Sequence, residues 1–204
     1  MKTAIKICGI TRIDDANLCE ELEVEFIGLN MVQSSPRHIT IDKAMRIRAT
    51  LTRAIPVLVF ENENLGKVLT IAKEIDCTHV QFHGSERIED LATLPLTVIK
   101  AYRFVPHATE LEHALNHVAF ALVDGTKNGQ RADIERAALL PESIRSRLFI
   151  AGGLNPANVV DVIERVHPFG IDSASGIESS PGIKDEKKLR AFVNTVRSVL
   201  PTSL

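Results

Sequence analysis

Short apolar runs recur along the whole chain, separated by longer segments of mixed polarity. The runs are Ala4–Cys8, Glu25–Met31, Pro56–Phe60, His79–Phe82, Val98–Tyr102, Phe120–Asp124, Leu148–Ala151 and Gly170–Ala174. Val, Ile, Leu and Phe dominate them with little polar alternation, which is typical of strands buried on both faces of a parallel sheet. The pattern therefore predicts eight buried β-strands.

Between these runs, apolar residues recur at intervals of three or four, which is the spacing of a helix with one buried face. The predicted helices are Asp14–Glu23, Ile41–Arg53, Leu65–Ile75, Arg87–Leu94, Thr109–His117, Ile134–Leu140, Ala157–Val166 and Lys184–Leu200. Thr40 and Ser85 are predicted N-caps, and Pro156 is predicted at the first position of another helix.

Strands and helices alternate, which requires a parallel sheet with right-handed crossovers. Eight such units that close on themselves form a (β/α)8 barrel, although 204 residues is short for a fold of about 250. A doubly wound open sheet is the main alternative, but no Gly-x-Gly-x-x-Gly follows the first strand. No linker or low-complexity segment interrupts the pattern. We expect an α/β protein with a single (β/α)8 TIM-barrel domain over residues 1–204.

The composition is that of an ordinary globular protein, with 45% hydrophobic and 25% charged residues. The net charge of −2, with acids and bases interspersed, argues against nucleic acid as a partner but leaves small anionic ligands open. No apolar run approaches the roughly 18 residues of a membrane helix, and the N-terminus leads straight into a strand without a signal peptide. The predicted location is the cytoplasm, without a membrane partner.

The cysteine content is low: the chain has three, Cys8, Cys19 and Cys77, and no Cys-x-x-Cys pair. This number and spacing predict neither a disulfide framework nor a zinc site, and they fit a reducing compartment. The histidines show no metal-ligand spacing either, so no metal site is expected. Cys19 and Cys77 have no polar partners in sequence and are assigned to packing.

In such a barrel, the site is built at the carboxyl ends of the strands and in the loops that follow them. Residues with useful chemistry at those positions are Cys8, Arg37, Gln81, His83, Asp124, Gly152, Gly153, Asp172, Ser175 and Gly176. The glycines and Ser175 follow the last two strands, where backbone N–H groups can hold a phosphate. The alternative is that these glycines only form tight turns.

Cys8 and Asp124 follow the first and sixth strands, so their side chains could face each other across a small cavity. A thiolate and a carboxylic acid can divide a proton transfer between them. Two other readings stay open: Cys8 as a buried core residue, and Asp124 as a turn or cap residue.

Four further strand-end residues, Arg37, Gln81, His83 and Asp172, are expected to bind a substrate. The Arg37 guanidinium has the planar geometry that suits a carboxylate. Arg37 could equally be a solvated loop residue, and His83 could be a structural histidine.

Six segments together resemble the phosphoribosylanthranilate isomerase family of tryptophan biosynthesis. They are KICGIT at 6–11, SPR at 35–37, VQFHG at 80–84, AGGLNP at 151–156, GIDSASGIE at 170–178 and SPGIKD at 180–185. The resemblance runs from the first strand to the last helix, with the segments in the family's order.

That resemblance implies an Amadori rearrangement of a phosphoribosyl anthranilate, a small phosphosugar substrate. It implies Asp124 as the general acid that opens the ribose ring and Cys8 as the general base that removes the C2 proton. Arg37 would hold the anthranilate end, and backbone N–H groups near Gly153 and Ser175–Gly176 would hold the phosphate. No metal or organic cofactor is implied.

The chain departs from the family pattern after the sixth strand. Only Gly129 and Asp133 correspond there, and the family's two aromatic residues are missing. Leu58 also stands where glycine is common. We expect these changes to affect substrate packing and loop closure.

Other functions compete with this interpretation. One is another phosphosugar barrel enzyme, such as a metal-dependent ribulose-phosphate epimerase or a tryptophan synthase α-type lyase. His83 is the only strand-end histidine placed for the former, and Cys8 fits the latter poorly. The other is a barrel that binds a phosphate ligand without turnover. The sequence leaves the assembly open between monomer and homodimer.

Overall fold

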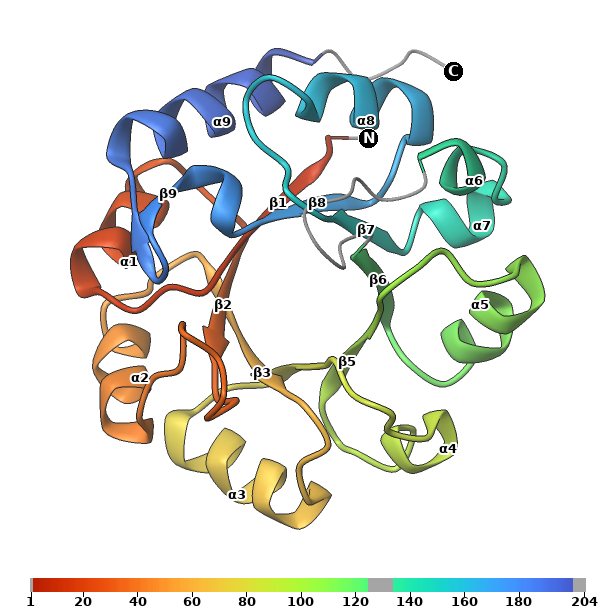
Figure 1. The fold of residues 1–204 in the computed structure, drawn as a ribbon. Coiled ribbons are helices and arrows are strands. Elements are labelled where there is room, and N and C mark those ends of the chain that lie inside the picture. Colours follow the sequence, from red (N-terminus) through yellow and green to blue (C-terminus); the bar gives the residue numbers. More distant parts are fainter. Residues whose placement is uncertain (1, 125–133, 200–204) are drawn as a thin grey trace.

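The fold is a closed barrel of eight parallel strands, each paired with its neighbours in sequence order and β8 paired with β1. The computed structural model describes residues 2–124 and 134–199 (Figure 1). The strands are β1 (Ala4–Cys8), β2 (Phe26–Asn30), β3 (Ile55–Phe60), β4 (His79–Phe82), β5 (Thr97–Tyr102), β6 (Phe120–Asp124), β7 (Leu148–Ala151) and β8 (Gly170–Ser173). The predicted (β/α)8 architecture is confirmed, and no predicted strand end differs by more than one residue from the structure.

The absence of polar alternation has a simple origin: both faces of every strand are buried. On β1, Ile5 and Ile7 pack against the outer helices, while Ala4 belongs to a second apolar cluster inside the barrel. Successive side chains of a strand point to opposite faces, so Lys6 and Cys8 share the inward face with Ala4.

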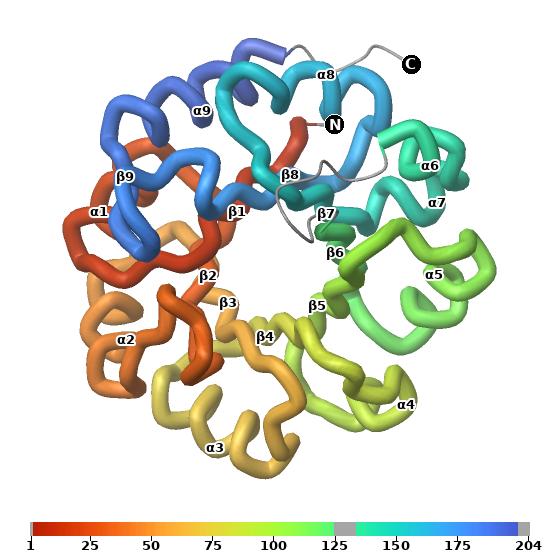
Figure 2. Tube along the Cα trace, viewed as in Figure 1, coloured from red at the N-terminus to blue at the C-terminus, as the bar shows by residue number. Residues whose placement is uncertain are grey.

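Helices surround the barrel as an outer ring (Figures 1 and 2). In the described part of the chain they are α1 (Ile13–Glu21), α2 (Ile41–Arg48), α3 (Leu65–Ile75), α4 (Ile88–Leu91), α5 (Ala108–Leu115), α6 (Ile134–Ala138), α7 (Glu142–Arg145), α8 (Val159–Val166) and α9 (Glu186–Ser198). The prediction for α3 is confirmed at both ends, and Thr40 caps α2 by accepting a hydrogen bond from the N–H of Lys43. None of these helices is long and apolar enough to cross a bilayer.

The prediction that α2 reaches Arg53 is wrong, because α2 ends five residues earlier. The backbone N–H groups of Thr52, Arg53 and Ala54 donate to the carboxylate of Glu20, on α1, instead of continuing the helix. Glu20 of α1 therefore binds the segment after α2 over residues where the helix was predicted to continue.

Two predicted helix starts are also wrong. Ser85 does not cap α4: its N–H and hydroxyl both donate to Oδ1 of Asn62. Helix α8 begins at Val159 instead of beside Pro156, and the side chain of Asn158 binds back to the preceding loop.

A short hairpin lies between β8 and α9 that the sequence patterns did not predict. It consists of the 3₁₀ turn η1 (Ser175–Ile177) and the antiparallel pair β9 (Glu178–Ser180) and β10 (Ile183–Lys184). Helix α9 consequently starts at Glu186, capped by Asp185, and not at Lys184.

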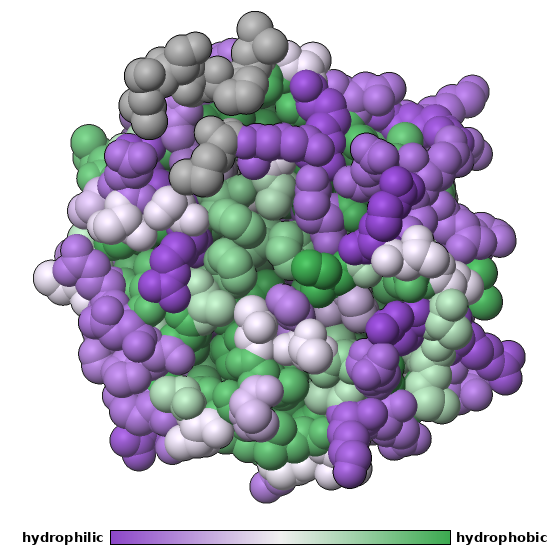
Figure 3. All heavy atoms as spheres, turned by 180° about the vertical axis from the view of Figure 1, so that it is seen from behind, coloured by the Kyte–Doolittle hydropathy of each residue, from purple (hydrophilic) through white to green (hydrophobic). Residues whose placement is uncertain are grey.

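Aromatic rings fill the barrel near the amino ends of its strands. Phe149 is fully buried there, with ring centroids 5.5 Å from Phe26, 5.6 Å from Phe120 and 5.2 Å from Phe169. Figure 3 views the molecule from the side opposite Figure 1 and shows hydrophobic surface at the centre within a polar surround. One end of the barrel is thus apolar, and the polar groups of the interior lie toward the other.

Candidate active site

A buried ion pair joins the neighbouring strands β1 and β8 on the interior face of the barrel, where Lys6 and Asp172 are direct partners in the strand register. Nζ of Lys6 lies 3.1 Å from Oδ1 of Asp172, and their side chains are 0% and 9% exposed. Burial lowers the pKa of Lys6, but Asp172 and Cys8 outweigh it, so that the pKa lies above its usual value and the amine is charged. The pKa of Asp172 is raised, because burial outweighs the opposing effect of Lys6.

Cys8 lies two residues beyond Lys6 on the same face of β1 and is partly buried. Its sulfur fits against Gly28 on β2, where an added Cβ would come within 2.7 Å of Sγ. Its carbonyl oxygen accepts a hydrogen bond of 2.7 Å from Nζ of Lys184. The pKa of the Cys8 thiol lies above its usual value, because burial raises it more than the cations Lys6 and Lys184 lower it, and Asp172 adds to the increase.

Asp124 ends β6 on the inward face that it shares with Leu122, a member of the interior cluster. His83 follows β4, and its Nε2 lies 3.9 Å from Oδ2 of Asp124. The two side chains are 25% and 29% exposed, so both reach the solvent side of the interior. Burial lowers the pKa of His83 and Asp124 opposes this, so the imidazole is neutral at pH 7.

Gln81 offers a buried acceptor inside the barrel. The residue is 2% exposed, and its Oε1 has no hydrogen-bond partner among residues 2–124 and 134–199. A buried acceptor of this kind ordinarily has a partner. Its place suits the predicted binding of a polar substrate group, which stays a prediction.

Arg37 is held by a carboxylate of its own chain. Its Nε and Nη2 donate to the two oxygens of Glu178 at 2.9 and 2.7 Å. Lys184 and the N–H of Gly182 donate to the same carboxylate. The hydrogen bond to Glu178 raises the pKa of Arg37; burial raises the pKa of Glu178, but its cationic partners outweigh this and lower it. We expected the Arg37 guanidinium to bind a substrate carboxylate. In the structure it forms a bidentate ion pair with the Glu178 carboxylate, which fixes its orientation.

The two predicted phosphate loops pack directly on each other. Gly152 and Gly153 have φ values of +111° and +63°, which favour glycine. The hydroxyl of Ser173 donates to the carbonyl of Leu154 at 2.7 Å, and a Cβ on Gly176 would overlap that same carbonyl oxygen. The loops after β7 and β8 thus form one unit, with glycine required at their contact.

Sequence reasoning missed Lys6, Gly28, Glu178 and Lys184 as parts of this region. Lys6 could have been recognised from the sequence. It lies within an apolar strand, two residues before Cys8 and therefore on the same face, and a lysine buried in this way needs a charged partner. Glu178 and Lys184 gave none, since their contacts depend on the hairpin.

The segment after Asp124, residues 125–133, lies outside the described residues, and with it Gly129 and Asp133. Within the described ranges, no group of three or more His, Cys, Asp and Glu side chains is placed to hold a metal ion.

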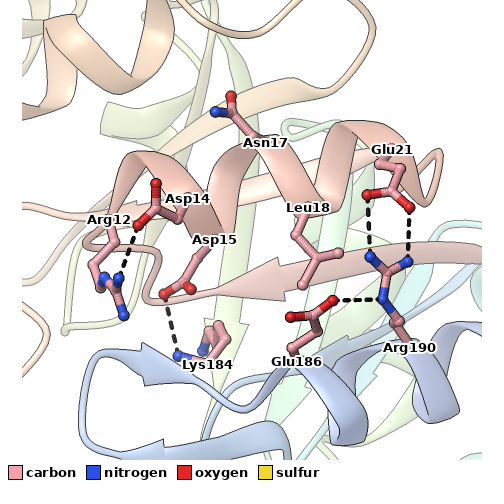
Figure 4. A pocket seen from close by; sticks show the side chains of 9 residues that line it. All are labelled: Arg12, Asp14, Asp15, Asn17, Leu18, Glu21, Lys184, Glu186 and Arg190. Atoms are coloured by element: carbon pink, nitrogen blue, oxygen red, sulfur yellow. Dashed lines mark hydrogen bonds and ion pairs between the residues drawn. The ribbon is translucent and has the colours of Figure 1, made fainter.

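A separate groove of about 530 Å³ lies outside the barrel, between α1 and the start of α9 (Figure 4). Its charged side chains bind one another: Arg190 pairs with Glu21 and Glu186. The carboxylate of Asp15 accepts a hydrogen bond from the N–H of Lys184. The Arg190–Glu21 pair thus joins α9 to α1, and the Lys184–Asp15 hydrogen bond joins β10 to α1.

Fold and site together define a (β/α)8-barrel enzyme whose strand ends combine a thiol, carboxylates, buried cations and glycine loops. Residues 5–195 match the family model of N-(5'-phosphoribosyl)anthranilate isomerase. The chain therefore belongs to the N-(5'-phosphoribosyl)anthranilate isomerase family, a family of isomerases in tryptophan biosynthesis.

Individual relatives agree with this assignment. The N-(5'-phosphoribosyl)anthranilate isomerase of Xylella fastidiosa is 34% identical over 207 aligned positions, covering 96% of this chain and 92% of the relative. The crystal structure of phosphoribosyl anthranilate isomerase from Thermus thermophilus is 32% identical with a TM-score of 0.87, covering 96% of this chain and 99% of that one. A further structure of such an isomerase, in complex with reduced 1-(o-carboxyphenylamino)-1-deoxyribulose 5-phosphate, is 33% identical with a TM-score of 0.80, covering 97% and 100%.

Proposed function

We propose that this chain converts N-(5-phosphoribosyl)anthranilate to 1-(2-carboxyphenylamino)-1-deoxyribulose 5-phosphate, with Cys8 as the general base and Asp124 as the general acid. The supporting observation is that both residues end strands on the faces that line the barrel interior. A relative that binds a reduced form of this product, at 33% identity over nearly the full chain, adds support.

In the first step, the carboxylic acid of Asp124 gives its proton to the ring oxygen of the ribose. The bond between that oxygen and C1 breaks, and the anthranilate nitrogen supplies the electron pair that forms an iminium. A carboxyl group at the mouth of the interior is suited to this, because proton transfer requires contact with both substrate and a route for reprotonation.

In the second step, the thiolate of Cys8 takes the proton from C2, and the electrons of that C–H bond neutralise the iminium to give an enolamine. Moving the proton of the 2-hydroxyl to C1 then gives the ketone. The substrate's own iminium accepts the electrons, so the protein has to supply only an acid, a base and a fixed geometry.

The remaining strand-end residues would hold the substrate. Arg37, whose guanidinium is oriented by Glu178, is proposed to bind the anthranilate carboxylate. The sugar hydroxyls are proposed to be bound by Gln81, His83 and Asp172. The phosphate is assigned to backbone N–H groups of the paired glycine loops, at Gly152, Gly153, Ser175 and Gly176.

The test is the loss of anthranilate-type fluorescence when enzymatically generated phosphoribosylanthranilate is mixed with the purified protein. Cys8→Ala and Asp124→Asn should each lower kcat by about 10²- to 10⁴-fold, as expected when a proton-transfer group is removed. Binding of a reduced product analogue should persist in both variants.

Cys19→Ala is the matched control for the cysteine, because Cys19 is a fully buried thiol of α1. It should retain turnover. Near-normal kcat in Cys8→Ala would remove the proposed base, and analogue binding by the unaltered protein without turnover would establish a non-catalytic binding barrel instead.

A further inference from the structure

Lys6 is the most deeply buried charged residue near the proposed base. Its side chain is fully buried, its amine lies 3.1 Å from Asp172, and it precedes Cys8 by two positions on the inward face of β1. A buried ammonium is costly unless it is paired, and one partner already satisfies that need. The pair lies on the same inward face as the sulfur, and Lys6 acts on Cys8 electrostatically, so a further role for Lys6 has to be considered.

The charged groups that act on Cys8 come from four elements. Lys6 on β1, Lys184 on β10 and Arg37 after β2 are cations, while Asp172 on β8 is the carboxylate among them. Glu178 neutralises one more positive charge by binding both Arg37 and Lys184. Three cations thus face two carboxylates, and a thiolate at Cys8 would make the cluster neutral.

The cations differ in what else they do. Arg37 and Lys184 both donate to Glu178, and Lys184 also donates to the carbonyls of Cys8 and Ala174. Within residues 2–124 and 134–199, Lys6 has one carboxylate partner, Asp172, which occupies one of its three donor positions. Lys6 is therefore the cation with donor capacity to spare for a negative charge at the sulfur.

We propose that Lys6 is a positioning residue for the reaction: anchored by Asp172, its ammonium supplies the counter-charge that lets Cys8 exist as a buried thiolate. This inference rests on the proposed role of Cys8 as the base. It explains how a thiolate can form beside a substrate that carries a carboxylate and a phosphate.

The test follows the rate at which iodoacetamide alkylates Cys8 as a function of pH, with the Cys8 peptide identified by mass spectrometry. This measurement requires no substrate. In Lys6→Met the midpoint should move to higher pH by about one to three pH units, the range expected when a neighbouring opposite charge is lost. The rising limb of kcat/KM against pH should move in the same direction.

Asp172→Asn should move the midpoint the opposite way, because it removes the carboxylate that opposes thiolate formation. Lys100→Met is the matched control: Lys100 is also a buried strand lysine, paired with Glu86 at 2.8 Å, but lies on the outward face of β5. It should leave the midpoint unchanged.

Lys6→Met leaves Asp172 buried without its partner and could fail to fold. In that case the double variant Lys6→Met/Asp172→Asn, which removes both charges, is measured instead. Its midpoint of Cys8 alkylation should also move to higher pH, but by less than in Lys6→Met. A wild-type midpoint in a folded protein lacking Lys6 would overturn the proposal. A shifted midpoint in a protein that does not turn over phosphoribosylanthranilate would instead uphold the electrostatic role and refute the proposed function.

Discussion

At the residue scale, burial and charge act on Cys8 in opposite directions. Desolvation favours the neutral thiol, while the ammonium groups of Lys6 and Lys184 favour the thiolate. For the proposed role of Cys8 as the general base, the position of the sulfur matters as much as its charge, because a base must lie within reach of the proton that it takes. Gly28 sets that position, since it faces Cys8 in the β1–β2 register.

Gly28→Ala should displace the sulfur, because the new Cβ would lie 2.7 Å from Sγ and 3.0 Å from Cα of Cys8. We expect kcat to fall by about 10²-fold, the scale on which a shift of about 1 Å lowers rates. KM should change little. Steady-state kinetics measure both constants.

Gly66→Ala is the control for this substitution. Gly66 lies on helix α3, outside the barrel, and a Cβ added there would come close only to the side-chain oxygen of Asn64. Turnover should be unaffected there. An unchanged kcat in Gly28→Ala would show that the reaction does not depend on the place of this sulfur.

At the element scale, Glu20 joins α1 to the segment that leads from α2 into β3. Its carboxylate accepts from the N–H groups of Thr52 and Arg53 at 3.1 Å and of Ala54 at 2.7 Å, and from the hydroxyl of Thr52 at 2.7 Å. Burial raises the pKa of Glu20, but these donors outweigh it and the pKa is lowered. One side chain of α1 thus holds the segment between α2 and β3 in a non-helical path.

Glu20→Gln should lower the free energy of unfolding by about 1 to 2 kcal/mol at pH 7, because hydrogen bonds to a charged acceptor become neutral ones. The lowered folded-state pKa means that the stabilisation is complete above the ordinary glutamate pKa of about 4.3. It is lost as the pH falls through the lower, folded-state value.

Urea unfolding of both proteins across this acidic range checks the prediction. The difference between them should shrink as the pH falls. Glu23→Gln is the control on the same part of the chain, because Glu23 pairs with Arg53 at a side-chain exposure of 67%. It should change stability by less than about 0.5 kcal/mol. A pH-independent difference for Glu20→Gln would contradict the ionic origin.

At the scale of the whole molecule, the two ends of the barrel differ in the side chains that they enclose. The amino ends of the strands enclose a cluster of phenylalanine rings, and the carboxyl ends carry the ionisable groups. The apolar rings and the ionisable groups therefore lie at opposite ends of the barrel, and in this fold the catalytic site is typically at the carboxyl ends of the strands.

Phe149→Ala should cost about 3 to 5 kcal/mol of unfolding free energy, because it opens a cavity among three other rings. The pH midpoint of Cys8 alkylation should stay that of the unaltered protein. Urea unfolding and the alkylation assay measure the two effects. Phe104→Ala removes a ring that is 61% exposed and should change stability by less than about 0.5 kcal/mol. A loss of unfolding free energy in Phe104→Ala as large as that in Phe149→Ala would contradict the special contribution of the interior rings to stability.

The strands could be predicted closely from the sequence, whereas several helix ends could not. A run such as Val57–Phe60 is apolar throughout because both of its faces are buried, so its own residues mark it. The end of α2 depends on Glu20, about 30 residues away, and the start of α4 depends on Asn62. Contacts between distant residues leave no periodic signal.

By itself, the sequence determined the alternating barrel and the strand-end places of Cys8, Asp124 and the glycine loops, because period and position follow from local residue order. Only the tertiary structure decided what surrounds them. It paired Lys6 with Asp172 and Arg37 with Glu178, across 166 and 141 positions of sequence. The physical reason is that closing the barrel brings β8 and its hairpin against β1, and burial there obliges each charge to find a partner.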